Sequence, residues 1–334
     1  MVALSDFVAQ LRRSVGIRQK QDIQLAARYL SGNPDKDPQS ILLGDDCAAI
    51  WQGDRYLLLA TEGMLPSLVT QEPWFAGWCA VMVNVSDIYA MGGEPLAVVD
   101  TLWLPSTSES RQLWEGMQAA AEAYHVPIVG GHTNGNSPYS ALSVAILGQA
   151  QHLITSFNAQ EGDVLLMVID LRGEFYQDYL FWNAATKSDR QRLRDDLAIL
   201  PQIAHSGWCD AGKDISMGGV LGTALMLLET SGCGAVIDLD AIVQPINCDR
   251  MAWLQSFPSY GFLLSARSQY VPFIQKAFHE RGLSCEAIGS INQSQELTLK
   301  LGTERARFWN LGEEPLMGWT SYSASCGRRV IGNG

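Results

Sequence analysis

The chain has 334 residues, of which 47% are hydrophobic and 17% charged, and at roughly 100–200 residues per domain it can form two domains with separate cores. Its net charge of −12 argues against a nucleic-acid backbone or an anionic membrane as partner, but not against a nucleotide bound with metal ions. It contains no uncharged apolar run of about eighteen residues and no hydrophobic signal core, so we expect a soluble cytoplasmic protein. The seven cysteines are scattered without a Cys-x-x-Cys pair, which indicates neither a disulfide framework nor a zinc site.

The first part of the chain predicts a helix and then a β-hairpin. In chain order we expect a helix over 18–30, a polar loop over 31–40, two short apolar strands within 41–51, a turn at Gly53-Asp54, a return strand over 56–60, and a loop over 66–74. Two carboxylates, Asp45 and Asp46, interrupt the first strand pair after Gly44. Glu62 ends the return strand and is followed by Gly63.

A buried helix with polar residues in its middle follows this hairpin. Its apolar run starts near Phe75 and stops at Gly92-Gly93, and Pro95 lies beyond, which is typical of a helix C-terminus. Asn84 and Asp87 are three residues apart and therefore share one helix face. A carboxylate inside such a helix loses solvation that only a cation or several hydrogen-bond donors can restore. From the helix alone, Asp87 is either a ligand or the cap of a neighbouring loop.

The rest of the chain predicts alternating strands and helices. In the first half we expect a buried strand over 96–104, a helix from about 106 to 124, a short strand over 126–129 that ends in a Gly130-Gly131 turn, and a strand over 141–148. In the second half we expect strands at 164–169, 235–239, 260–266, 284–290 and 296–300, a mainly helical stretch over 173–207, and helices over 220–230 and 269–281. The polar stretch 149–158 separates the halves. The prediction is an α/β (α+β) protein with one domain over 1–150 and another over 151–334.

A few acids stand out because each ends an apolar element beside glycine or small residues. They are Asp45, Asp46, Glu62, Asp87 and Asp214. Oxygen ligands at strand ends and helix starts suit magnesium, whose coordination is usually completed by phosphate oxygens. The Gly130-Gly131 segment and the helix start at 216–219 can supply backbone N–H donors to those phosphates. Each signal is weak alone.

Taken in order, six segments resemble one superfamily. They are GDDCAAI at 44–50, TEG at 61–63, VNVSDIYAMGGEP at 83–95, IVGGHTN at 128–134, and DISMGG with SGCGAVIDLDAI at 214–219 and 231–242. The superfamily comprises the aminoimidazole-ribonucleotide (AIR) synthases, the thiamine-monophosphate kinases, the selenophosphate synthetases and the carbamoyl-dehydrating hydrogenase maturation factors, collectively called PurM-like. The resemblance covers roughly residues 40–245 and fits an uncharacterised AIR synthase-related branch better than any named member.

The resemblance implies a two-domain fold in which the first domain pairs with a second copy through its sheet, giving a homodimer. It also implies ATP bound with Mg²⁺ in a groove between the domains, and a small-molecule substrate. Position by position, it makes Asp45, Asp87 and Asp214 metal ligands. Glu62 stands where the family has Asp, with Thr61 beside it as a further oxygen, and Asp46 completes the predicted metal set.

The remaining predicted site residues contact the cofactor or the reacting groups. Ser216 matches a nucleotide contact, and Asn84, Gly130, Gly131, Gly218 and Gly219 are expected to bind the cofactor. His132 occupies a position that is Asp in the thiamine-monophosphate kinases and His in the selenophosphate synthetases. We expect His132 and Asp87 to be the catalytic residues, with His132 contacting a phosphate, binding a metal or acting as a base.

Four departures limit the function that the resemblance implies. Met217 replaces the second Asp of the kinases' Asp-Ile-Ser-Asp-Gly, and residues 65–69 replace the segment that helps hold thiamine phosphate. No Cys precedes Cys47, whereas the selenophosphate synthetases have a catalytic Cys or selenocysteine near the N-terminus. The last Cys, Cys326, lies before the end of the chain, whereas the hydrogenase maturation factors end in a reactive Cys. Two hypotheses stay open. One is an enzyme that phosphorylates or ATP-activates a small molecule, with thiamine-monophosphate kinase-like or selenophosphate synthetase-like activity as variants. The other is a nucleotide-binding regulator or scaffold without turnover.

Overall fold

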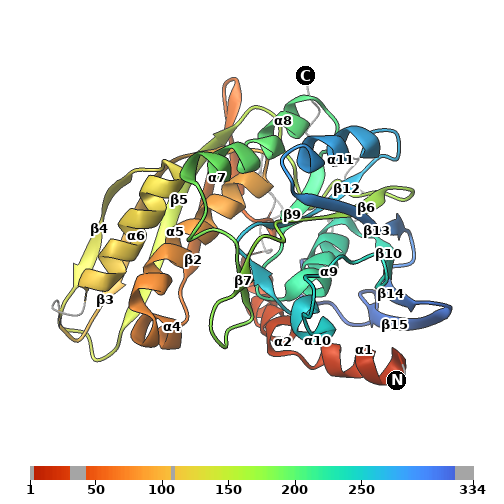
Figure 1. The fold of residues 1–334 in the computed structure, drawn as a ribbon, viewed down its shortest axis with the longest axis horizontal. Helices are drawn as coiled ribbons and strands as arrows, with labels where there is room; N and C mark the ends of the chain where they lie inside the picture. The colour runs from red at the N-terminus through yellow and green to blue at the C-terminus, as the bar shows by residue number, and fades with distance from the viewer. Residues whose placement is uncertain (1–3, 31–42, 107–109, 320–334) are drawn as a thin grey trace. The chain divides into compact units, whose positions relative to one another are not determined.

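The computed structural model describes residues 4–30, 43–106 and 110–319, and it divides the chain into two compact units (Figure 1). One unit, here called the amino unit, comprises residues 46–151 and 185–202. The other, the carboxyl unit, comprises 1–45, 152–184 and 203–334. Both are mixed α/β, as predicted. The predicted loop over 31–40 and Cys326 lie outside the described residues, and no helix among those residues has the length and apolarity that a membrane crossing requires.

The amino unit is built on a five-stranded sheet with the order β1-β2-β5-β3-β4. The strands are β1 (Ala48–Gln52), β2 (Arg55–Gly63), β3 (Glu94–Trp103), β4 (Ile128–Asn134) and β5 (Ala141–Ala150). β1 and β2 form the expected antiparallel hairpin, with Gln52 paired to Arg55. β3 and β4 are parallel because the connection between them contains a helix, whereas the other pairs are antiparallel.

Helices cover one face of this sheet, as Figure 1 shows for α5 and α6. The helices of the unit are α4 (Pro66–Gln71), α5 (Pro73–Ala90), α6 (Arg111–Tyr124) and α7 (Arg190–Leu197). α5 and α6 approach closely at Gly77 and Gly116, where a Cβ would overlap the main-chain oxygens of Leu113 and Trp74 respectively. α5 packs onto β2, β5 and β3 and is buried from Phe75 to Ala90. The predicted buried helix is therefore confirmed.

Three predicted elements of the amino unit were wrong. Residues 66–74 are not a loop, because prolines at the first helical position start both α4 and α5. β3 is not buried on both faces, since its side chains alternate between buried and exposed. Gly130 and Gly131 do not form a turn, because β4 continues through them to Asn134 and pairs with β3.

The carboxyl unit is built on a seven-stranded mixed sheet with the order β15-β14-β10-β13-β6-β12-β9. Its strands are β6 (Val164–Ile169), β9 (Ala211–Asp214), β10 (Gly234–Asp238), β12 (Gly261–Ala266), β13 (Ser284–Asn292), β14 (Glu296–Leu301) and β15 (Glu304–Asn310). A small sheet adds β7 (Glu174–Phe175), β8 (Phe181–Asn183) and β11 (Phe257–Pro258). The prediction of a mainly helical stretch over 173–207 was wrong at β7 and β8, where Phe175 and Trp182 pack edge to face.

The carboxyl unit also contains helices, several of which contribute to one apolar core. The helices are α1 (Leu4–Arg12), α2 (Val15–Lys20), α3 (Ile23–Leu30), α8 (Ile199–His205, at the join between the units), α9 (Gly219–Ser231), α10 (Arg250–Leu254) and α11 (Val271–His279). Of these, α1, α2, α9 and α10 contribute to the core. α9 is buried over almost its whole length and packs against β9 and β12. Leu4, Leu11 and Ile17 at the start of the chain belong to the same core as α9. The first residues of the chain therefore pack with its second half.

Candidate functional site

The polar residues in the middle of α5 are buried among its apolar ones. Asn84 is fully buried and Asp87 is 6% exposed. The side-chain N–H of Asn84 donates to the main-chain oxygen of Ala80 at 2.8 Å, one turn earlier, and its Oδ1 accepts no hydrogen bond from the described residues. A buried amide oxygen without a donor is unfavourable, which is typical of a position that binds something else.

Asp46 lies close to Asp87 within the amino unit. Asp46 precedes β1, and a carboxylate oxygen of each residue lies within 4.8 Å of the other. Two ionised carboxylates at this separation repel one another unless a proton or a cation lies between them. Oxygen ligands lie about 2.0–2.1 Å from Mg²⁺, so both side chains fit one such ion after a small adjustment. The structure thus brings together two of the predicted metal ligands.

Asp45 has different neighbours although it is adjacent to Asp46 in the chain. Its Oδ2 accepts a hydrogen bond from the N–H of Ser156 at 2.8 Å, and its Oδ1 lies 3.6 Å from Nζ of Lys213. Both charged side chains are almost fully buried, so each compensates the charge of the other. Asp45 therefore holds the carboxyl unit together in this structure, and its role as a metal ligand stays a prediction.

Thr61 and Glu62 lie at the end of β2, where we expected them. Thr61 Oγ1 donates to the main-chain oxygen of Val144 at 3.2 Å, and Glu62 is exposed. Glu62 pairs with Val144, a buried residue of β5, so its side chain points to the helix-covered face of the sheet. That is the face on which α5 carries Asp87.

The glycine-rich segment 130–134 forms an exposed edge strand. Gly130, Gly131 and His132 are exposed, and His132 pairs with Thr101 of β3. Because β4 pairs with a strand on one side only among the described residues, part of its main-chain N–H groups point away from the sheet and can donate to a ligand. Asp100 points to the same face of the sheet as Glu62, because both pair with Val144, and the next residue, Thr101, points to the other face. His132 pairs with Thr101, so its imidazole lies on the face opposite Glu62.

The carboxyl unit carries the remaining predicted residues. Asp214 ends β9 and is 6% exposed, and the buried Oγ of Ser216 has no hydrogen-bond partner among the described residues. Gly218 caps the N-terminus of α9, where main-chain N–H groups are available to an anion. Gly219 has a structural reason to be glycine, because its φ is +64° and a Cβ would overlap the main-chain oxygen of Leu254.

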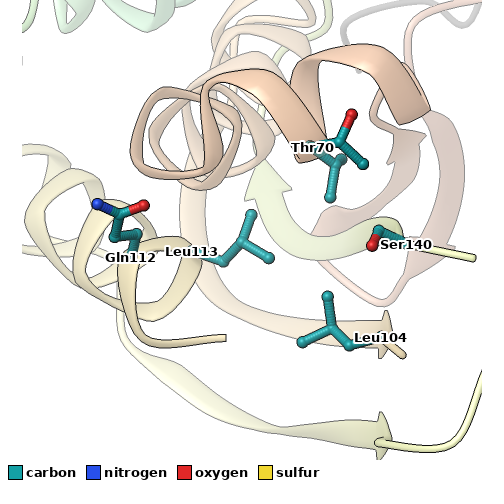
Figure 2. Close-up of a pocket in the computed structure, with 6 residues that line it drawn as sticks. Thr70, Leu104, Gln112, Leu113 and Ser140 are labelled. Atoms are coloured by element: carbon teal, nitrogen blue, oxygen red, sulfur yellow. The ribbon is translucent and has the colours of Figure 1, made fainter. Parts of the chain in front are cut away.

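A cavity of about 300 Å³ lies within the amino unit, at the end of β3 (Figure 2). It is lined by Val69, Thr70, Leu104, Gln112, Leu113 and Ser140. None of these side chains is charged, so the cavity suits a small uncharged group better than a phosphate. Val69 belongs to the segment 65–69 that departs from the thiamine-monophosphate kinases.

One buried acid escaped the sequence analysis. Asp100 lies in the middle of β3 and is only 4% exposed, and burial raises the pKa of its carboxyl group. Neither carboxylate oxygen has a hydrogen-bond partner among the described residues. A lone Asp within the apolar run of residues 96–104 was the signal that could have identified it.

Comparison with known proteins matches each half of the chain to a known domain family. Residues 44–150 match the AIR synthase related protein, N-terminal domain, and residues 160–302 match the AIR synthase related protein, C-terminal domain. The uncharacterized protein sll0787 of Synechocystis sp. is 55% identical over 96% of this chain and all of its own length. A thiamine-monophosphate kinase of Synechococcus elongatus is 28% identical over 64% of this chain and 72% of its own.

A solved structure supports the same assignment at the level of the fold. AaThiL complexed with AMPPCP and TMP superposes with a TM-score of 0.63 at 22% identity, covering 86% of this chain and 96% of that one. The fold is thus the two-domain AIR synthase-like fold that the sequence motifs predicted. Since the two domain matches together span well over half of the sequence, the chain belongs to the AIR synthase related family.

Proposed function

We propose that this protein is an Mg²⁺-dependent enzyme that uses ATP to phosphorylate or activate a small molecule. The observation that carries the proposal is the approach of Asp46 and Asp87, whose carboxylates are close enough to share a divalent cation. The relatives support the use of ATP, since they include a thiamine-monophosphate kinase and a protein solved with AMPPCP, an ATP analogue.

The proposed metal ligands are Asp46 and Asp87 in the amino unit, together with Asp45, Thr61, Glu62 and Asp214. Bound magnesium would neutralise the phosphate charges and align the γ-phosphoryl group, which is most of what phosphoryl transfer requires. Asn84 adds a buried amide oxygen that is free to accept from a metal-bound water or a nucleotide. We propose that the main-chain N–H groups of Gly130, Gly131 and Gly218 and the hydroxyl of Ser216 donate to phosphate oxygens. The N–H of Gly219 instead donates to the main-chain oxygen of Ser216 at 2.8 Å, so Gly219 contributes by allowing the positive φ at this turn.

We propose that His132 contacts the transferred phosphate or the acceptor. It is exposed on the edge strand β4 with its imidazole on the sheet face opposite Glu62, so this contact requires a bound molecule that extends around the edge of the sheet. A neutral imidazole can accept a proton from an acceptor, whereas a protonated one can donate to a phosphate. Asp87 is the other proposed catalytic residue because it would hold the ions that contact the reacting phosphate.

The second candidate is a nucleotide-binding regulator or scaffold without turnover. Met217 favours it, because this apolar side chain is 41% exposed at the position where the kinases have a second acid. Loss of one ligand weakens metal coordination and need not abolish nucleotide binding. Release of ADP in the presence of candidate acceptors separates the two functions, since only the enzyme forms ADP.

The test of the site is isothermal titration of ATP into wild-type protein and the Asp87→Asn variant, with and without Mg²⁺. We expect Mg²⁺-dependent ATP binding in the wild type and its loss in Asp87→Asn, because the amide is neutral and a poorer metal ligand. Asp54→Asn is the matched control, since Asp54 is an exposed turn residue paired with Arg55. Normal ATP binding by Asp87→Asn would refute the metal assignment, provided that circular dichroism finds both variants folded.

We also propose a homodimer formed through the uncovered face of the amino-unit sheet. Leu59, Val99 and Leu147 are between 37% and 48% exposed on that face. Leu59 pairs directly with Leu147, and Ala145, two residues earlier on the same face, pairs with Val99. An exposed apolar sheet face of this kind is typical of an interaction surface. Sedimentation velocity tests the proposal, and a monomer at all concentrations would refute it.

A further inference from the structure

Asp100 belongs to a row of residues that crosses the amino-unit sheet. Glu62 of β2 and Asp100 of β3 both pair with Val144 of β5, and Asp100 also pairs with Gly131 of β4. Residues in direct register point to the same face of a sheet. Asp100 therefore lies on the helix-covered face, two strands from Glu62 and next to the glycine-rich segment of β4.

Gly131 leaves room for the Asp100 carboxyl group. A Cβ at residue 131 would overlap Oδ1 and the carboxyl carbon of Asp100, so the acid occupies the space that a side chain on β4 would take. The carboxyl group thus leans toward the exposed edge strand. Residues 129–134 of that strand are all exposed, so a molecule can bind along β4. A change of side-chain rotamer is enough to bring the carboxyl group of Asp100 to such a molecule.

A purely structural role does not fit Asp100. Elsewhere in the chain, the buried carboxylates of Glu229 and Asp163 each accept three hydrogen bonds. Asp100 accepts none from the other described residues, and the side chains two positions before and after it on the same strand face, Val98 and Leu102, are buried and apolar. A buried carboxyl group without donors destabilises the folded state, unless a ligand supplies the donors.

A shared magnesium ion does not fit Asp100 either. Strands lie about 4.8 Å apart, so the Cα atoms of Glu62 and Asp100, on strands two apart, are separated by about 10 Å. Magnesium requires close to six oxygen ligands at about 2.1 Å, and the side chains that flank Asp100 on its strand face, Val98 and Leu102, offer none. N–H donors are the complementary partner, because a single carboxylate can accept two of them side by side.

We propose that Asp100 is a specificity-determining residue that binds an amino or amidine group of the small molecule on which the enzyme acts. The inference rests on the proposed function, because the ligand in question is its phosphoryl acceptor. The acceptor lies along β4, and its N–H groups donate to the carboxylate of Asp100 beside Gly131. Acceptors in which carbon replaces this nitrogen are therefore poor substrates.

The test uses acetamidine as a minimal probe, with tetramethylammonium, a cation without N–H groups, as the matched control at equal ionic strength. Each is titrated into the full-length protein, the Asp100→Asn variant and Asp54→Asn, while the ¹³C carboxyl resonance of Asp100 and the thermal midpoint are followed. We expect acetamidine to shift this resonance and raise the midpoint of the wild type and Asp54→Asn. In Asp100→Asn its binding falls about tenfold or more, because charge-assisted hydrogen bonds are lost.

Two outcomes would overturn the proposal. One is equal binding of acetamidine to the wild type and Asp100→Asn, and the other is an Asp100-dependent effect of tetramethylammonium as large as that of acetamidine, which would indicate attraction of any cation. Titration of the wild type with ATP and Mg²⁺ is run in parallel. If the wild type does not bind ATP with Mg²⁺, the proposed function is refuted. If it binds ATP with Mg²⁺ but acetamidine has no effect, only the role of Asp100 is refuted.

Discussion

Two buried acids of the carboxyl unit and one of the amino unit have opposite surroundings. In the carboxyl unit, Glu229 on α9 accepts hydrogen bonds from the main-chain N–H groups of Leu316, Met317 and Gly318 at 2.7–3.2 Å. In the amino unit, Asp100 and the Oδ1 of Asn84 accept none from the described residues. Acids of the first kind hold segments of the chain together, whereas those of the second kind lower stability until a ligand arrives.

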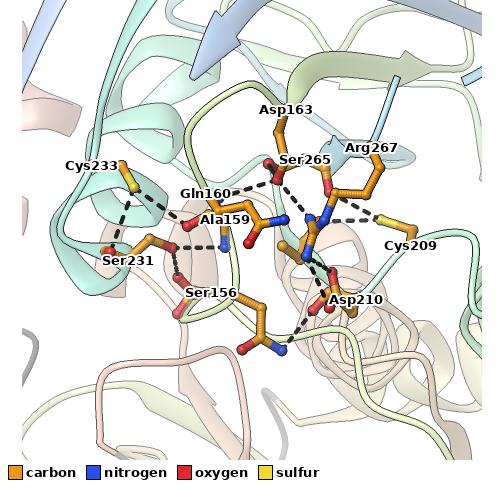
Figure 3. Close-up of polar contacts among 12 residues, drawn as sticks. Ser156, Ala159, Gln160, Asp163, Cys209, Asp210, Ser231, Cys233, Ser265 and Arg267 are labelled. Atoms are coloured by element: carbon orange, nitrogen blue, oxygen red, sulfur yellow. Dashed lines mark hydrogen bonds and ion pairs between the residues drawn. The ribbon is translucent and has the colours of Figure 1, made fainter. Parts of the chain in front are cut away.

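Asp163 is a second buried acid whose carboxylate is satisfied by other residues of the chain, and Figure 3 shows its network. Asp163 is 1% exposed, and its Oδ2 accepts from Ser265 Oγ at 2.8 Å and from Arg267 Nη1 at 2.7 Å. The N–H of Gln160 donates to the same oxygen at 3.1 Å. Arg267 also contacts Asp210 at 3.2 Å, so the buried charge is compensated from several sides. This contrast separates Glu229 and Asp163, which the chain itself satisfies, from Asp100, which accepts no hydrogen bond from the described residues.

Glu229→Ala tests whether a buried acid of the carboxyl unit stabilises the folded protein, and it has the largest expected effect. We expect it to lower the free energy of unfolding by about 3–5 kcal/mol, because three main-chain N–H groups lose a charged acceptor. Urea denaturation measures the change. Glu229→Gln is the control, since it keeps an oxygen acceptor and should lose clearly less. A loss under about 1 kcal/mol for Glu229→Ala would mean that residues 316–318 find other acceptors.

Asp163→Asn should have a smaller effect of the same sign. We expect a loss of about 1–3 kcal/mol, because the amide oxygen can still accept one hydrogen bond while the ion pair with Arg267 is lost. Asp210→Asn is the matched control, since its side chain is 44% exposed and its ion pair with Arg267 is screened by water. Equal losses in the two variants would show that burial of Asp163 does not matter.

The smallest predicted effect is a pH dependence that comes from Asp100. Burial raises the pKa of its carboxyl group above the ordinary value. At a pH between the ordinary pKa and this raised one, the carboxyl group is therefore protonated in the folded state and ionised in the unfolded state. Stability therefore falls as pH rises from the ordinary pKa through the folded one, and stays lower above it. We expect Asp100→Asn to remove this slope and to be about 1 kcal/mol more stable than the wild type at neutral pH.

Urea denaturation at several pH values between 3 and 8 measures this difference. Asp54→Asn again serves as the control, because Asp54 is exposed and its pKa is lowered by a hydrogen bond from Arg55, which gives a slope of opposite sign. If Asp100→Asn destabilises the protein at neutral pH, then Asp100 is satisfied in the folded state and the contrast between the units fails.

Much of the fold followed from local patterns. The hairpin of β1 and β2, the buried helix α5 and the helix α9 all had strong signals, because apolar spacing and glycine or proline breakers act over a few residues. The errors arose where long-range contacts overrode those signals. Gly130 and Gly131 look like a turn, but pairing with β3 keeps them extended. The apolar run of β3 looks buried on both faces, but helices cover only one.

The sequence motifs are enough to place this chain among the AIR synthase-like proteins and to predict that Asp87 lies inside a buried helix. They do not predict which acids come close together. Asp45 and Asp46 are adjacent in the chain, yet Asp45 pairs with Lys213 while Asp46 approaches Asp87. Strand register placed Asp100 beside Gly131 and in line with Glu62. The physical reason is that local patterns fix elements and their faces, whereas register and packing fix which charges share a site.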